Sequence, residues 1–227
     1  IGDYILKNRS DFVAEPEITK ASGEHPTPLS FSQQRLWFLD QLDPGSIAYN
    51  MPSAVRLTGS VDVAILNKAI NTIIERHDAF RTTFSVKSKA PTQLIAPAEW
   101  ITIQPLDLSS EESPYNAALE KVNQLFRTSF TLETGPLYIF NLFKLSETDF
   151  ILAFNLHHII SDGWSIGIII KELGELYAAY LHGEECPLKP LSIQYSDFSS
   201  WQRDYLKNEV LEKQASFWKQ QLGGCPD

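Results

Sequence analysis

Two adjacent histidines, His157 and His158, stand shortly before an Asp-Gly pair formed by Asp162 and Gly163. Imidazole titrates close to neutral pH, so a histidine can take up or release a proton under physiological conditions. Successive side chains of a strand point to opposite faces, so these two rings diverge. Diverging rings do not ligate one metal ion together, which argues against a metal site built from this pair. The spacing therefore predicts one working histidine and one supporting histidine.

The histidine pair lies where a buried strand is expected to meet a helix. Residues 150–155 form a nearly continuous apolar run, typical of a strand covered on both faces. Apolar residues then recur at helical spacing from Ile166 to Tyr177. The N-terminus of such a helix offers backbone N–H groups and a positive dipole end to a ligand. The alternative interpretation is structural, with two hydrogen-bonded core histidines and Asp162 as the helix N-cap.

The rest of the chain alternates between predicted helices and strands, which indicates an α/β or α+β fold with a mixed, mostly antiparallel sheet flanked by helices. Periodicity predicts helices at residues 30–42, 62–76, 113–127, 164–181, 196–206 and 211–222. It predicts strands at residues 49–57, 80–86, 93–95, 101–103, 137–145 and 149–157, the last two forming a hairpin. Residues 13–28 lack periodicity and are expected to be a linker that follows the end of a helix at residues 1–12.

Bulk properties exclude several functional classes. The net charge of −9 over 227 residues argues against a nucleic-acid-binding surface. No apolar run approaches the ~18 residues of a membrane helix, so no membrane partner is expected. Two cysteines, Cys186 and Cys225, do not make a disulfide framework. We therefore expect a reducing, cytoplasmic location.

Four short segments carry a recognisable pattern: SFSQQRLWFL at residues 30–39, RHDAFRTTF at 76–84, LHHIISDGWS at 156–165 and YSDFSSW at 195–201. In order and spacing they resemble the core motifs of the condensation domain of nonribosomal peptide synthetases, within the chloramphenicol-acetyltransferase-like superfamily. The third segment alone recurs across that superfamily, whereas the four together are specific. The sequence departs from the family pattern mainly at Ser32, Asp78, Phe80, Leu156 and the serine pair Ser199-Ser200.

The resemblance covers about residues 28–222 and implies the amino-terminal half of a two-lobed domain. In this family the active site lies in a tunnel between two similar subdomains, and the later motifs belong to the second one. Those later motifs are not found in this sequence. We therefore expect residues 1–27 to be the tail of an upstream carrier domain and a linker, and residues 28–227 to be the amino-terminal subdomain. The half alone is expected to be inactive.

The resemblance also implies a reaction. The amine of an acceptor aminoacyl thioester attacks a donor acyl or peptidyl thioester, and an amide forms. Both substrates hang on phosphopantetheine arms of upstream and downstream peptidyl carrier domains, and the domain itself binds no cofactor and no metal. Holding two tethered groups in line can lower a barrier by ~7–11 kcal/mol. No serine or cysteine elbow motif is present, so an acyl-enzyme is not indicated.

The residues then receive roles. His158 is expected to contact the acceptor amine, either as a base or by orienting it and offsetting charge. The N–H of Gly163 is expected to face the oxyanion, and His157 to be structural. Asp162 is expected to form an ion pair with Arg81, which would lower its pKa and make it a poor base. Two further motif residues are expected to serve packing and ion pairing, Arg76 and Trp201.

Other functions stay open at this level. One alternative is an acyltransferase that uses acyl-CoA and a small alcohol or amine. Another is a non-catalytic half that only folds and docks carrier domains. Within the family, an epimerising or a dehydrating variant also stays open, whereas the cyclising type is disfavoured because in that type aspartates replace the histidines. Residues 160–165 look most like the type that takes an L-configured donor.

Overall fold

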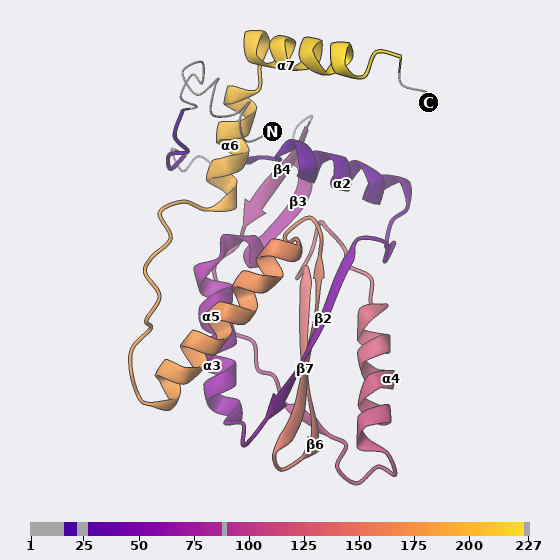
Figure 1. The fold of residues 1–227 in the computed structure, drawn as a ribbon, viewed down its shortest axis with the longest axis vertical. Coiled ribbons are helices and arrows are strands. Elements are labelled where there is room, and N and C mark those ends of the chain that lie inside the picture. The colour runs from indigo at the N-terminus through magenta and orange to yellow at the C-terminus, as the bar shows by residue number, and fades with distance from the viewer. Residues whose placement is uncertain (1–15, 22–26, 88–89, 225–227) are drawn as a thin grey trace.

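The computed structural model describes residues 16–21, 27–87 and 90–224 (Figure 1). Its main body is built on a four-stranded sheet in the order β2 (Asn50–Thr58), β7 (Asp149–His157), β6 (Tyr138–Ser146) and β5 (Pro105–Asp107). β7 pairs antiparallel with β2 and β6, whereas β5 pairs parallel with β6. The sheet is therefore mixed and mostly antiparallel, and the predicted hairpin is present.

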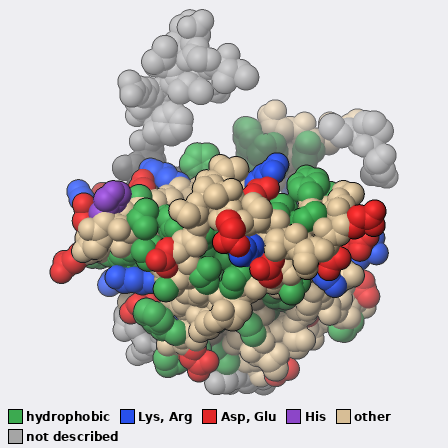
Figure 2. Space-filling model, turned by 90° about the horizontal axis from the view of Figure 1, so that it is seen from below, with side chains coloured by type: hydrophobic (Ala, Val, Ile, Leu, Met, Phe, Trp, Pro, Cys, Tyr) green, Lys and Arg blue, Asp and Glu red, His purple; other side chains and the backbone are tan. Residues whose placement is uncertain are grey.

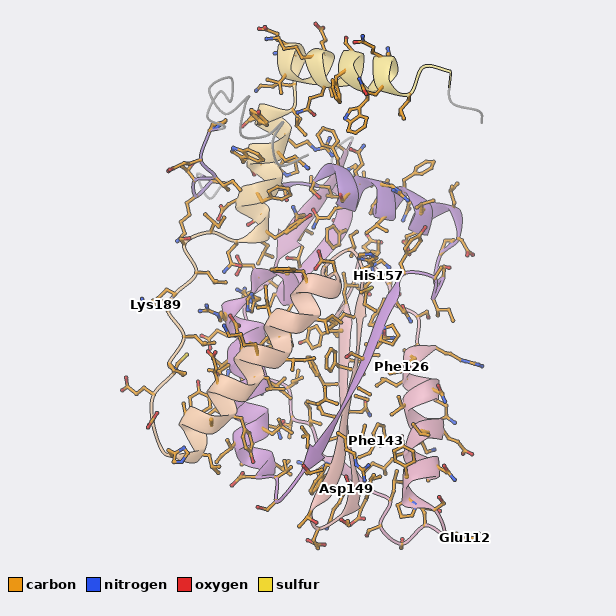
Figure 3. All side chains as sticks on the ribbon, in the orientation of Figure 1. Glu112, Phe126, Phe143, Asp149, His157 and Lys189 are labelled. Atoms are coloured by element: carbon orange, nitrogen blue, oxygen red, sulfur yellow. The ribbon has the colours of Figure 1, made fainter. Side chains whose placement is uncertain are left out.

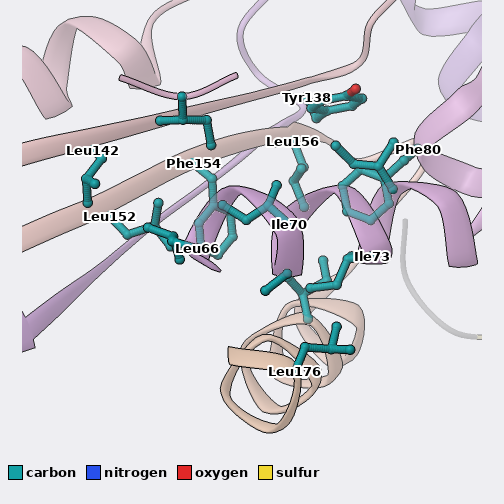
Figure 4. Packing of buried hydrophobic residues seen from close by; sticks show 14 of the residues in the cluster. Leu66, Ile70, Ile73, Phe80, Tyr138, Leu142, Leu152, Phe154, Leu156 and Leu176 are labelled. Atoms are coloured by element: carbon teal, nitrogen blue, oxygen red, sulfur yellow. The ribbon is translucent and has the colours of Figure 1, made fainter. Parts of the chain in front are cut away.

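Helices cover both faces of this sheet, which is why β7 is apolar along almost its whole length (Figure 1). α3 (Val63–Arg76) and α5 (Gly163–Leu181) pack on one face, where Figure 4 shows Ile70 of α3 and Leu176 of α5 in one cluster with Phe154 of β7. α4 (Pro114–Phe126) covers the other face, on the side of Phe143 in Figure 3. The two cores fix the end of β7 in position.

A second, three-stranded sheet lies beside the histidine end of β7 (Figure 1). Its order is β1 (Thr27–Pro28), β4 (Ala90–Ile95) and β3 (Thr82–Lys87). α2 (Phe31–Leu42) and α6 (Tyr195–Tyr205) lie against it, and the buried side chains of Leu29, Phe84 and Ile159 join it to the histidine turn. This sheet therefore brings the first, second and fourth motifs to the third.

Two predicted strands are absent or shorter in the structure. Residues 101–103 form no strand, because two asparagines of α3 take the place of a partner strand. Asn71 pairs with both the N–H and the C=O of Ile101 at 2.8 Å, and Asn67 does the same for Ile103 at 2.6 and 2.9 Å. Residues Asp78–Arg81 form the 3₁₀ helix η2, so the strand predicted to begin at residue 80 begins at Thr82.

The expected linker is also more structured than predicted at its carboxyl end. Thr27 and Pro28 pair with Gln93 and Thr92 of β4, and the N–H of Ala21 donates to Asp197 at 2.8 Å. The helix end expected at residues 1–12 lies outside the described residues. The segment from residue 27 onward therefore belongs to the folded unit.

The carboxyl-terminal helix α7 (Asn208–Gln221) projects from the body and buries none of its residues (Figure 1). On the face shown in Figure 2, acidic and basic side chains are interspersed among hydrophobic and polar ones. Within the described ranges, no helix is long and apolar enough to cross a membrane.

Candidate active site

His157 is the last residue of β7 and is buried, with 3% of its surface exposed (Figure 3). Its Nδ1 accepts a hydrogen bond from the N–H of Ile159 at 3.1 Å, and its ring packs edge-on against Phe130. Burial, and then the neighbouring His158, lowers the pKa of His157 to about 4. This ring is therefore neutral at pH 7, which suits the predicted supporting role.

His158 lies one residue later, in the turn, and its side chain is exposed. Its backbone N–H donates to the carbonyl of Tyr49 at 2.8 Å, and its Nδ1 lies 2.7 Å from the carbonyl oxygen of Ser161. A carbonyl oxygen only accepts hydrogen bonds, so Nδ1 must carry the proton. In the neutral ring the lone pair is then on Nε2, at the far side of the imidazole. The turn thus fixes a tautomer that can accept a proton at Nε2.

Asp162 is the N-cap of α5, as in the structural interpretation of the sequence. Its carboxylate accepts from the N–H of Ser165 at 2.8 Å and from the Ser165 hydroxyl at 2.6 Å. These hydrogen bonds, helped by the charge of nearby His158, lower the pKa of Asp162. The carboxylate is therefore ionised and weakly basic, which agrees with a role other than that of the base.

The predicted ion pair between Arg81 and Asp162 is wrong. Arg81 pairs instead with Asp78, three residues earlier in η2. Its guanidinium also donates to the carbonyls of Ala96 at 2.6 Å and Ile74 at 3.3 Å. The 3₁₀ turn directs Arg81 back over the end of α3, so its hydrogen-bonding capacity is used there. Arg81 consequently joins η2 to α3 and β4 rather than shaping the histidine turn.

A cavity of about 220 Å³ lies beside the histidine turn, and we call it the motif cavity. All four sequence motifs border it. The first motif supplies Ser32, Gln33 and Leu36, the second Asp78, Ala79 and Thr82, the third His158 to Asp162 with Ser165, and the fourth Tyr195 and Ser196. Segments that are far apart in the chain therefore meet around one imidazole.

Gln33 supports the turn from the first motif. It is buried, and its amide donates to the carbonyl of Ile159 at 3.4 Å and to the side chain of Gln93 at 3.2 Å. Gln93 in turn donates to Ser199 of α6 at 2.9 Å. The sequence interpretation assigned no role to Gln33, although its place in the first motif was the available signal.

The other predicted residues lie outside the motif cavity. Arg76 of α3 donates to Glu172 of α5 at 3.2 Å and to the carbonyl of Lys189 at 2.6 Å. Trp201 stacks on Tyr205 and donates to the carbonyl of Pro16 at 2.9 Å. Arg76 thus joins α3 to α5 by an ion pair, and Trp201 packs on α6 and binds the backbone near the start of the described chain.

Gly163 is the first residue of α5 and does not line the motif cavity among the described residues. A Cβ added there would meet no atom within 4 Å. Gly163 therefore lies at an exposed surface, with open space on the side where a Cβ would stand.

The described part of the chain contains no cluster of three or more His, Cys, Asp or Glu side chains able to hold a metal ion.

Residues 24–227 match the family model of the condensation domain. The chain belongs to the condensation-domain family.

Curated relatives of this condensation domain are large synthetases. The chain is 42% identical over 210 residues to one of the proteins that make up the linear gramicidin synthase of Brevibacillus parabrevis, covering 92% of the chain and 4% of that protein. It is 39% identical over 210 residues to malpinin synthetase of Mortierella alpina, covering 92% of the chain and 3% of that protein. The chain thus spans only a few per cent of the length of these relatives.

Solved structures show the same fold over about half of their chains. The X-domain from teicoplanin biosynthesis, in complex with OxyB, matches with a TM-score of 0.81 and 26% identity, over 94% of this chain and 47% of that chain. The starter condensation domain of rhizomide synthetase matches with a TM-score of 0.82 and 21% identity, over 90% and 49%. The chloramphenicol-acetyltransferase-like fold expected from the sequence is confirmed.

Proposed function

We propose that this chain is the amino-terminal half of a condensation domain that forms an amide between two carrier-bound substrates. The donor is an acyl or peptidyl thioester and the acceptor is an aminoacyl thioester, each on a phosphopantetheine arm. The observation that carries the proposal is the geometry of His158, whose Nδ1–H is held by the Ser161 carbonyl while its ring borders the motif cavity. The relatives named above are synthetases, which supports the same reaction class.

The proposed chemistry needs one proton carrier. The acceptor nitrogen attacks the donor carbonyl carbon, a C–N bond forms, and the C–S bond breaks. Nε2 of His158 accepts the proton that the nitrogen loses and returns it to the departing sulfur, so that a thiol leaves. A positioned base of this kind contributes ~10²–10⁴-fold. Orientation of the two tethered groups supplies the larger part of the rate.

The first turn of α5 is proposed to stabilise the oxyanion. The first N–H groups of a helix have no partner within the helix, and the positive end of the dipole lies there. The N–H of Gly163 is one of these groups, and Gly163 is exposed at the start of α5. Asp162 holds the turn as a cap and His157 supports it as a neutral core residue.

The partners follow from the same proposal. Upstream and downstream peptidyl carrier domains deliver the substrates, and a carboxyl-terminal half completes the tunnel. The amino-terminal half contributes the imidazole but is proposed to be inactive alone. A cytoplasmic location and an L-configured donor belong to the proposal as well.

The test is made in the complete condensation domain with donor and acceptor loaded on their carrier domains. His158→Ala should lower amide formation at least about 100-fold, in the range of a lost acid–base group. The matched control is His182→Ala, because His182 is also exposed and its Nδ1 also lies 2.7 Å from a main-chain carbonyl, that of Ala178. Near-full turnover of His158→Ala, with a control of equal activity, would overturn the assignment.

Two arms of the same assay separate the other functions. Acyl-CoA replaces the carrier-bound donor in one arm, and turnover there equal to that with the carrier would favour a CoA-dependent acyltransferase. In the other arm the isolated chain is assayed with and without the second half added in trans. Activity only with both halves is expected, and no activity in either case would favour a carrier-docking role.

A further inference from the structure

A second cavity adjoins the motif cavity, and we call it the side pocket. It holds about 360 Å³ and lies between η2, the first turns of α5 and residues 191–195. The two cavities share five lining residues: Ala79, Ile160, Ser161, Ser165 and Tyr195. The two cavities therefore adjoin along a common wall formed by these residues.

The walls of the side pocket are mainly apolar. Phe80 and Leu156 belong to the core cluster in Figure 4, and α5 contributes Ile168 and Ile169. A cavity of ~150 Å³ lined by apolar side chains holds a benzene ring. The side pocket is more than twice that size, so one large aromatic or branched side chain fits inside it.

The carboxylate on the wall, that of Glu172, is paired with neighbouring side chains. One carboxylate oxygen of Glu172 of α5 accepts a hydrogen bond from Nε of Arg76 at 3.2 Å. The other carboxylate oxygen lies 2.7 Å from Nε2 of His77. Gln194 accepts from the N–H of Asp78 at 3.2 Å and donates to the carbonyl of Arg76 at 2.9 Å. The Glu172 carboxylate is thus paired with a cation, and both the oxygen and the nitrogen of the Gln194 side-chain amide are hydrogen-bonded.

The hydroxyl groups on the wall are also engaged. Ser161 donates to the carbonyl of His157 at 3.2 Å, and Ser165 donates to Asp162 at 2.6 Å. The hydroxyl of Tyr195 lies 3.0 Å from that of Ser30. A charged or amide side chain placed in the pocket would lose its water and find its partners already taken, which costs free energy. An apolar side chain has no hydrogen bonds to water to lose, and its burial in the pocket is favourable.

We infer that the side pocket receives the side chain of the acceptor aminoacyl group and selects large apolar acceptors. The inference rests on the proposed function. In that function the acceptor nitrogen contacts His158, and the acceptor Cβ is two bonds from this nitrogen, whereas the donor Cβ is three bonds away. The acceptor side chain is therefore the substituent that begins nearer to His158, which lines the motif cavity that shares a wall with the side pocket.

The first test compares acceptors in the complete, unmodified condensation domain with one fixed donor. Glycyl, leucyl, phenylalanyl, aspartyl and lysyl groups are loaded in turn on the downstream carrier domain. Leucyl and phenylalanyl acceptors should exceed aspartyl and lysyl acceptors in kcat/KM by at least about tenfold, the usual worth of one well-filled or mismatched pocket. Equal kcat/KM for apolar and charged acceptors would overturn the inference.

The second test fills the pocket. Ile168→Trp is suitable because Ile168 lines the pocket yet is 39% exposed, so the fold tolerates a larger residue. It should lower kcat/KM for the phenylalanyl acceptor at least about tenfold and leave the glycyl acceptor within about twofold. The matched control is Ile170→Trp, on the same helix and 40% exposed but outside the side pocket. It should leave both acceptors unchanged.

The glycyl acceptor distinguishes failure of the pocket assignment from failure of the proposed function. Amide formation with glycine but no difference between Ile168→Trp and Ile170→Trp would overturn the pocket assignment and leave the proposed function standing. No amide with any acceptor in the unmodified domain would overturn both. Ile168→Ala is the second variant, and it should raise turnover of a tryptophanyl acceptor relative to leucyl, whereas an unchanged ratio contradicts the inference.

Discussion

Two neighbouring imidazoles differ because the strand ends between them. His157 is still in β7 and points into the core, whereas His158 is in the turn and exposed. Burial holds the pKa of His157 at about 4, so its ring stays neutral and accepts the N–H of Ile159. The backbone of Ser161 fixes the tautomer of His158. Period-two geometry predicted the divergence, whereas the tautomer depends on a main-chain carbonyl that the sequence does not reveal.

The buried histidine predicts a specific dependence of stability on pH. Its folded pKa of about 4 lies below the unfolded value of 6.5, so between these values the unfolded chain binds a proton that the folded chain does not. The contribution of His157 to the unfolding free energy is therefore fully present above pH 6.5 and is lost as the pH falls towards 4. Because of His157, the unfolding free energy at pH 5 should be about 2 kcal/mol lower than at pH 7. Urea unfolding at both pH values measures this difference.

His157→Asn is the variant that isolates this contribution, because its Oδ1 is bonded to Cγ as Nδ1 is, so it can still accept the N–H of Ile159 but does not titrate. Its unfolding free energy should fall by about 2 kcal/mol less than that of the unmodified chain over the same pH interval. His182→Asn, at an exposed position, should behave like the unmodified chain. An identical pH dependence for all three proteins would contradict a buried, neutral His157.

At the scale of elements, α3 takes the place of a missing strand. Its asparagines Asn67 and Asn71 pair with the backbone of residues 101–103, which otherwise would have needed a partner strand. Alternating isoleucines at 101 and 103 predicted a strand because the pattern reports which side chains are buried and not what the backbone pairs with. The hairpin of β6 and β7 was predictable because each strand is the other's partner and the turn is short.

These asparagines give a prediction for α3. Asn71 is 1% exposed and satisfies both the N–H and the C=O of Ile101. Asn71→Ala leaves both groups without a side-chain partner and should lower the unfolding free energy by about 2 kcal/mol. Asn123→Ala, on the exposed side of α4, is the control and should change it by no more than about 0.5 kcal/mol. Equal urea midpoints for the two variants would show that the hydrogen bonds of Asn71 with Ile101 contribute nothing to the unfolding free energy.

At the scale of the whole molecule, the site is a meeting point of four segments that the two sheets hold in place. The motifs marked the segments, but only the fold places Gln33, Ala79 and Tyr195 around His158. The same reason explains the mistaken pairing of Arg81. A sequence motif says that an arginine and an aspartate recur together, whereas the 3₁₀ turn decides which carboxylate the guanidinium reaches.

The side pocket was not predicted at all. Its walls combine Phe80 from the second motif with Ile168 of α5 and Leu191 of the following loop, which has no motif. Apolar residues on a helix face ordinarily predict core packing. Only the surplus space between η2 and α5 distinguishes a pocket wall from a packed core.

The carboxyl-terminal helix α7 is expected to contribute little to the stability of the main body. α7 buries no residue, and its largest apolar side chains, Phe217 and Trp218, are more than half exposed. A helix without buried apolar surface adds little to the folding free energy of the body. Ending the chain after Lys207 should therefore leave the urea unfolding free energy within about 0.5 kcal/mol of the full chain.

The comparison for this truncation is Arg203→Ala in α6, one element earlier. Arg203 donates to the carbonyl of Leu29 at 2.6 Å and lies 4.0 Å over the ring of Phe31, so it ties α6 to the start of α2. Its removal leaves that carbonyl unpaired and should cost about 2 kcal/mol. A truncation that costs as much as Arg203→Ala would mean that α7 folds back onto the body, because only buried contacts can supply that energy.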